Sequence, residues 1–152
     1  MKINKTKMDL LNNSRILALD IGTVRIGAAI SDPAGIIAQG IGVWNAENWL
    51  NDLDDCIKKF LPSVIVLGLP VRTDGKKSER AEKILLLREE LQAKYSEINF
   101  VTYDERFTTV IAQRTLLEAD TSRKKRKKNV DKLAAVLILQ DYLEGLHNNE
   151  KF

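Results

Sequence analysis

Residues 16–27 read ILALDIGTVRIG, two short apolar runs with a glycine-containing turn between them. Residues 15–19 are short, apolar and bounded by Gly22, which is typical of a buried strand. Ile26 to Ile30 then form its hairpin partner, joined to it through residues 22–25. This stretch predicts that the fold begins with an antiparallel pair of strands, the first of which ends on an acid, Asp20.

The remainder of the chain alternates between short strand patterns and longer helical ones. After the turn at 32–35 we expect a strand over 36–43, a helix over 49–61 with Asn45 as a cap, and a strand over 64–69. Further on we expect a helix from the cap Ser78 to about Lys94, a strand over 98–103, a short helix capped by Thr108, and a last helix over about 130–146, capped by Asn129, with Gly145 near its end.

The predicted order is β-β-β-α-β-α-β-α-α, which indicates one α/β domain with a mixed five-stranded sheet flanked by helices. Consecutive turns at the start give antiparallel strands, and the later crossovers give parallel ones. We expect a flexible polar leader at 1–14, the domain at 15–147 and a tail at 148–152. No linker or repeat divides the 152 residues.

Composition excludes several classes of protein. With 44% hydrophobic and 30% charged residues the chain is not disordered, and its single cysteine, Cys56, forms no intrachain disulfide. No segment has the apolar length of a signal peptide or membrane span, so we expect a cytoplasmic protein without a membrane partner. We expect Cys56 to be a core residue and His147 to lie in a solvated tail.

Three acids lie where apolar stretches meet polar ones: Asp20, Glu105 and Asp131. Ligands of open α/β sheets gather outside the carboxyl ends of the strands, where Asp20 and Glu105 both fall. We expect Asp131 to begin a helix that crosses this edge. Three carboxylates at one place repel one another unless a cation is present, and Mg²⁺ or Mn²⁺ prefers such oxygen ligands. Two such ions activate a water and stabilise the departing oxygen of a phosphodiester.

Each acid also has an ordinary structural explanation. Asp20 is equally typical of a residue that caps a turn, and Glu105 is able to pair with its neighbour Arg106. Asp131, in the first turn of its predicted helix, is favoured there by the helix dipole. The prediction of a site therefore depends on all three acids converging.

A run of six cations, Arg123, Lys124, Lys125, Arg126, Lys127 and Lys128, comes just before Asp131. The formal net charge is +3, and without these six charges it would be −3. Such a run is usually a solvated loop, but beside an acidic site it predicts contact with a nucleic-acid backbone. It contains no aromatic residue, so it would position a backbone without reading sequence.

These segments resemble the YqgF/RuvX family, whose members are described as Holliday junction resolvases and pre-16S rRNA nucleases. The match runs from about Ile16 to Leu146. Four stretches carry it, in order: 19–27, 66–70 with Asp74-Gly75, 104–109, and 123–128 followed by 130–135. This chain departs from the family at Val71-Arg72, where Leu-Asn is usual, and in its longer leader.

The resemblance implies an RNase H-like fold and a metal-dependent nuclease centre formed by Asp20, Glu105 and Asp131. It places Arg25 and Arg106 inside the matched motifs, where they contact phosphate or form salt bridges at the edge of the core. It also implies that Gly68 lets the backbone come close to the site.

Several functions stay open at this point. The first is an endonuclease that trims structured RNA at the 5′ end of the small-subunit ribosomal precursor, and the second cleaves branched DNA at the same site. A third is a non-catalytic ribosome-assembly factor, against which the three intact acids argue. A fourth is a sugar-kinase or actin-like ATPase, which needs two lobes and so does not suit one domain. The sequence leaves the oligomeric state open, a homodimer included.

Overall fold

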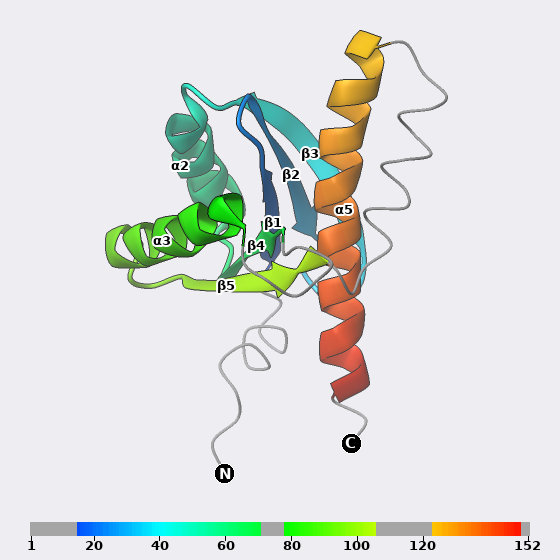
Figure 1. The fold of residues 1–152 in the computed structure, drawn as a ribbon. Coiled ribbons are helices and arrows are strands. Elements are labelled where there is room, and N and C mark those ends of the chain that lie inside the picture. The colour runs from blue at the N-terminus through cyan, green and yellow to red at the C-terminus, as the bar shows by residue number, and fades with distance from the viewer. Residues whose placement is uncertain (1–14, 71–77, 106–122, 150–152) are drawn as a thin grey trace.

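The computed structural model of the chain describes residues 15–70, 78–105 and 123–149, with only the backbone over 123–130 and at 149. Three strands come first, and single strands and helices then alternate (Figure 1). In chain order the elements are β1 (Ile16–Ile21), β2 (Arg25–Ser31), β3 (Ala38–Asn45), α2 (Trp49–Phe60), β4 (Val64–Leu69), α3 (Glu79–Lys94), β5 (Asn99–Asp104) and α5 (Arg123–Asn149).

The five strands form one mixed sheet in the order β3-β2-β1-β4-β5. The pairs β1–β2 and β2–β3 are antiparallel, whereas β4 runs parallel to both β1 and β5. This confirms the predicted α/β class, the antiparallel start and the parallel second half. β1 is central because it is buried on both faces, as its uninterrupted apolar run requires.

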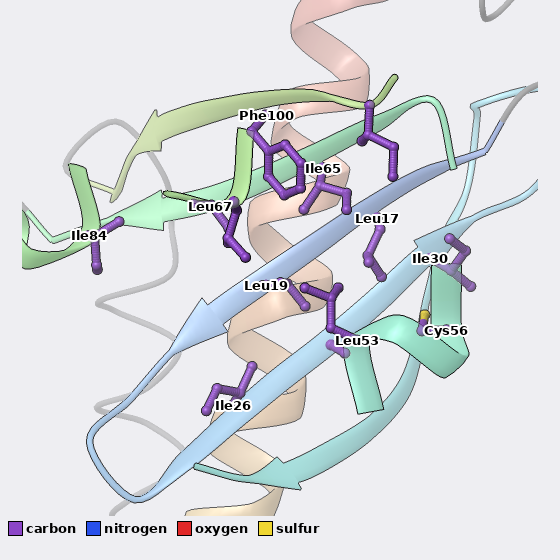
Figure 2. Packing of buried hydrophobic residues seen from close by; sticks show 13 residues of the cluster. Leu17, Leu19, Ile26, Ile30, Leu53, Cys56, Ile65, Leu67, Ile84 and Phe100 are labelled. Carbon is purple, nitrogen blue, oxygen red and sulfur yellow. The ribbon is translucent and has the colours of Figure 1, made fainter. Parts of the chain in front are cut away.

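Helices cover both faces of the sheet, with α2 and α3 on one side and α5 on the other (Figure 1). Alternate residues of the strands supply the two cores because neighbouring side chains of a strand point to opposite faces. Leu17 and Leu19 pack with Leu53 and Phe100 under α2 and α3, as Figure 2 shows. Ile16 and Ala18 pack instead against α5.

Local chemistry explains where α2 and α3 begin and end. Ser78 caps α3, as predicted: its Oγ accepts a hydrogen bond from Ala81 N at 3.1 Å. α2 ends at Phe60. Its C-cap is Leu61, directly before Pro62, and the φ of Leu61, 51°, lies in the left-handed region. The N-cap of α2 is Asn48, so the prediction of Asn45 was wrong; Asn45 ends β3 and its Oδ1 accepts from Glu47 N.

The last helix is longer at both ends than the sequence predicted. α5 begins at Arg123, so the six-cation run is helical and not a loop, and Asn129 is inside the helix and not its cap. Arginine and lysine have high helix propensity, which allows the helix to continue through the run. Gly145 does not end α5, and His147 is not in a solvated tail: its Nε2 lies 2.9 Å from Gly35 O.

Cys56 is a buried core residue, as predicted, and burial raises the pKa of its thiol to about 11. The leader at 1–14, the end of the tail and the helix predicted after Thr108 lie outside the described residues.

Candidate nuclease site

Asp20 lies within β1 on the face that α5 covers. Ile16 and Ala18 belong to the core under α5, and the two-residue period of a strand places Asp20 on the same face. Its position pairs with Gly27 of β2, and only 4% of the residue is exposed. Asp20 is thus a buried carboxylate at the carboxyl end of the central strand.

Glu105 directly follows β5 and lies over the neighbouring strand β4. Leu19 pairs with Leu67, so the next residues, Asp20 and Gly68, occupy adjacent positions on β1 and β4. A Cβ added to Gly68 would lie 2.9 Å from Oε1 of Glu105 and 2.6 Å from Ile138 of α5. Glu105 is 4% exposed. The missing side chain of Gly68 leaves the space in which the Glu105 carboxylate lies, next to the strand that carries Asp20.

Asp131 reaches the same region from α5, on the other side of Asp20. A Cβ added to Gly27 would lie 2.0 Å from the carbonyl oxygen of Asp131, so the helix backbone rests directly on β2 at this glycine. Asp131 is about two turns inside α5, so the explanation from a first-turn helix dipole does not apply. Its Oδ2 accepts a hydrogen bond from Nε of Arg25 at 3.1 Å.

Asp20 and the Glu105 carboxylate thus lie on the α5 face on either side of the β1–β4 pairing, and the backbone of Asp131 lies against Gly27, the residue that pairs with Asp20. In the described part of the chain, no three histidine, cysteine, aspartate or glutamate side chains are grouped so as to hold a metal ion. Asp20 and Glu105 nevertheless fit a hard divalent cation, because both are oxygen donors and buried carboxylates are retained where they pair or coordinate a cation. The carboxylate of Asp131 is instead paired with Arg25.

The predicted nucleic-acid contacts are only partly within the described residues. Arg25 forms a salt bridge at the edge of the core, the second of the two roles expected for it. Arg106 lies outside the described ranges. The backbone of residues 123–128 forms the first turns of α5, which extend beyond the end of the sheet where β1 turns into β2 (Figure 1).

One further cation, at the end of β1, was missed by the sequence analysis. Arg80, exposed in the first turn of α3, donates a 2.6 Å hydrogen bond from Nη2 to the carbonyl of Ile21, the residue after Asp20. Nothing in the local sequence singled it out, because the contact joins residues 59 positions apart. One signal could have located it: Ser78 caps α3, and the connection from β4 to α3 brings the first turn of this helix to the same edge of the sheet.

The fold is RNase H-like: a mixed five-stranded sheet in the order β3-β2-β1-β4-β5 with helices on both faces. Among solved structures, Thermus thermophilus RuvC in complex with a Holliday junction substrate superposes with a TM-score of 0.56 at 10% identity, over 88% of this chain and 96% of that one. A second RuvC structure from Thermus thermophilus gives a TM-score of 0.51 at 8% identity. At these identities the likeness concerns the fold alone.

The sequence comparisons identify the family. A family model described as "RuvX: Holliday junction resolvase" matches residues 14–145. A protein of Staphylococcus aureus (strain JH9) named "Putative pre-16S rRNA nuclease" is 44% identical over 138 residues, covering 88% of this chain and 97% of its own length. The homologue from strain N315 gives the same values. The chain belongs to the RuvX (YqgF) family of nucleases, as its motifs predicted.

None of the helices that the structure describes combines the length and apolar character needed to cross a membrane.

Proposed function

We propose that this protein is a divalent-metal-dependent endonuclease that hydrolyses phosphodiester bonds in structured RNA, with the 5′ end of the 16S rRNA precursor as its substrate. The observation that carries the proposal is the pair of buried carboxylates Asp20 and Glu105: Asp20 lies on β1 next to the position of Gly68 on β4, and the Glu105 carboxylate lies against Gly68. The RNA substrate is supported by the name of the curated relatives at 44% identity.

In this proposal Asp20 and Glu105 hold Mg²⁺ or Mn²⁺, and Asp131 completes the ligand set. The bound ions, two in the complete site, would supply an activated water and stabilise charge on the departing oxygen. The protein supplies the rest: β1 and β5 fix the carboxylates, and the sheet and α5 exclude water from the face on which they lie. Arg25, at the rim of the site, binds a phosphate of the substrate.

The cationic first turns of α5 position the substrate backbone. Contacts between these cations and phosphates do not depend on the base sequence of the nucleic acid. Removing the cations should therefore weaken binding and reduce its salt dependence without changing which bond is cut. Arg106 and residues 123–128 belong to this group of proposed phosphate contacts.

A second candidate uses the same site on branched DNA. The description of the matching family model, Holliday junction resolvase, favours it. Both substrates need the acids, a metal and a cationic approach, so the distinction between them has to come from measured cleavage.

The test is cleavage of two matched substrates, a precursor leader RNA and a four-way DNA junction, with Mg²⁺ and with chelator. We expect the wild type to cut the RNA faster, and chelator or Asp20→Asn to abolish cleavage while binding persists. Asp55→Asn is the matched control, because Asp55 is an exposed acid of α2 on the opposite face. Faster cleavage of the junction would select the DNA candidate, and equal turnover by Asp20→Asn would remove the catalytic assignment.

A further inference from the structure

The salt bridge between Arg25 and Asp131 occupies the third predicted metal ligand. Nε of Arg25 and Oδ2 of Asp131 lie 3.1 Å apart, and the side chains are 28% and 25% exposed. The two residues are 106 positions apart and belong to β2 and α5, so the bond forms only in the folded chain. Asp131 is therefore held by a cation of the protein itself.

The backbone on both sides of this pair is fixed. α5 rests on the sheet at two glycines: Gly27 lies against the carbonyl of Asp131, and Gly40 lies against the side chain of Lys132. The backbone of Arg25 is fixed as well, since its carbonyl accepts a hydrogen bond from Gly22 N at 2.9 Å. Any exchange of partners by Asp131 has to come from rotation of the side chains.

The alternative partner is close. Gly27, on which Asp131 rests, pairs with Asp20, and Arg25 is two residues before Gly27 on the same face of β2. Rotation of the Asp131 side chain away from Arg25 would bring a third carboxylate toward Asp20 and Glu105. The same rotation would release the guanidinium of Arg25, which is partly exposed to solvent.

The energies make such an exchange feasible. A partly exposed salt bridge contributes little to stability, so it is readily replaced. A guanidinium binds phosphate oxygens with the same charge-assisted hydrogen bonds that it makes to a carboxylate. A divalent cation between Asp20 and Glu105 would in turn attract the released carboxylate.

We infer that Arg25 is a positioning residue that holds Asp131 away from the metal until a substrate phosphate takes its guanidinium. The inference rests on the proposed function, because it assumes that Asp20 and Glu105 hold the cation. Its consequence is reciprocal: bound nucleic acid raises the affinity for metal, and bound metal raises the affinity for nucleic acid. The complete metal site is then assembled only on substrate.

The experiment is a titration of the full chain with Mn²⁺, followed by electron paramagnetic resonance. It is done alone and with a cleavage-resistant RNA, a 2′-O-methyl stem-loop with phosphorothioate linkages. For the wild type we expect the RNA to raise Mn²⁺ affinity about 5- to 20-fold, within the usual range of coupling between sites. Arg25→Ala should bind Mn²⁺ without RNA about as tightly as the wild type does with it, and RNA should add nothing further.

Arg80→Ala separates this mechanism from general electrostatics. It removes a cation at the end of β1 that bonds to the carbonyl of Ile21 and not to Asp131. We expect its Mn²⁺ affinity without RNA to stay near the wild-type value. An equal rise in both variants would overturn the inference, and so would an RNA-independent affinity in the wild type. Arg25→Gln, which keeps more of the side chain's packing, repeats the measurement if Arg25→Ala lowers the melting temperature.

The result also distinguishes the two proposals. If the wild type binds no Mn²⁺ with or without RNA, or if Asp20→Asn binds it equally well, the metal site fails and this inference fails with it. If binding depends on Asp20 but Arg25→Ala behaves like the wild type, the role of Arg25 alone is wrong and the proposed function stands.

Discussion

The two faces of the central sheet are built from alternate residues of the same strands, yet they have different chemistry. The face under α2 and α3 carries large apolar side chains such as Leu17, Leu19 and Phe100 (Figure 2). The face under α5 is lined by small residues and glycines at its carboxyl edge, and there it carries the buried acids. One face is suited to stability, whereas the other lets α5 approach the sheet closely at glycines that lie next to the buried acids.

The difference between the two faces is tested most strongly by substitutions at two consecutive residues, Leu19 and Asp20. Leu19→Ala should lower the free energy of unfolding by about 2–5 kcal/mol, because it leaves a cavity in the core under α2 and α3. Asp20→Asn should leave the melting temperature near wild type but reduce cleavage more than about 100-fold, since even outer partners of metal ligands cost about 10–100-fold.

Thermal unfolding measures the stability of the two variants, and cleavage rates are measured on the folded fraction of each. The comparison is contradicted if both variants lose stability equally, or if Leu19→Ala, once folded, is as inactive as Asp20→Asn.

A second pair of substitutions tests whether the glycines admit α5. Gly27→Ala should destabilise the fold by about 1–3 kcal/mol, because its Cβ would lie 2.0 Å from the backbone carbonyl of Asp131, which cannot rotate away. Gly42→Ala is the matched control in the next strand, where the added Cβ would lie 3.6 Å from Trp44 Nε1 in ordinary contact. Chemical denaturation of both variants gives the measurement; equal stability would mean that α5 does not depend on Gly27.

The smallest effect concerns Asp141, a partly buried acid of α5. Burial raises the pKa of its carboxyl above the ordinary value of 3.8, the nearby Glu144 adds to the shift, and Oδ2 has no hydrogen-bond partner among the described residues. The folded chain therefore keeps this proton at pH values where the unfolded chain has lost it, and stability falls as the pH rises through that window.

Asp141→Asn should remove this loss. At pH 7 its melting temperature should exceed that of the wild type by about 1–3 °C, the size expected for less than about 1 kcal/mol in a domain of this length, since water screens a partly exposed group. The difference should shrink as the pH is lowered toward 4. A difference that grows in acid would have the wrong sign for a raised pKa.

The fold was predictable from the sequence because its determinants are local. The hairpin at 16–30, the cap at Ser78 and the alternation of strands and helices each depend on neighbouring residues. The start of α5 was not predicted, since a run of charges resembles a loop although arginine and lysine suit a helix. Its end was wrong for a different reason: Leu146 and His147 make tertiary contacts that outweigh one glycine.

The positions of two acids of the candidate site were predictable, but the long-range bonds around the site were not. Asp20 and Glu105 were identified from their positions at strand ends, a pattern that depends only on neighbouring residues in the sequence. Two hydrogen bonds join residues far apart in the chain, that from Arg25 to Asp131 and that from Arg80 to Ile21. No local sequence pattern predicts them. These long-range contacts carry the inference about how the metal site is assembled.

The central claim is that Asp20 and Glu105 together hold a divalent cation, and a crystal of the protein soaked in Mn²⁺ tests it most directly. We predict an anomalous scattering peak on the α5 face of the sheet, within about 2.0–2.3 Å of a carboxylate oxygen from each of these two residues. A peak bound elsewhere, or a site in which the two carboxylates point away from any manganese at saturating concentration, would contradict it.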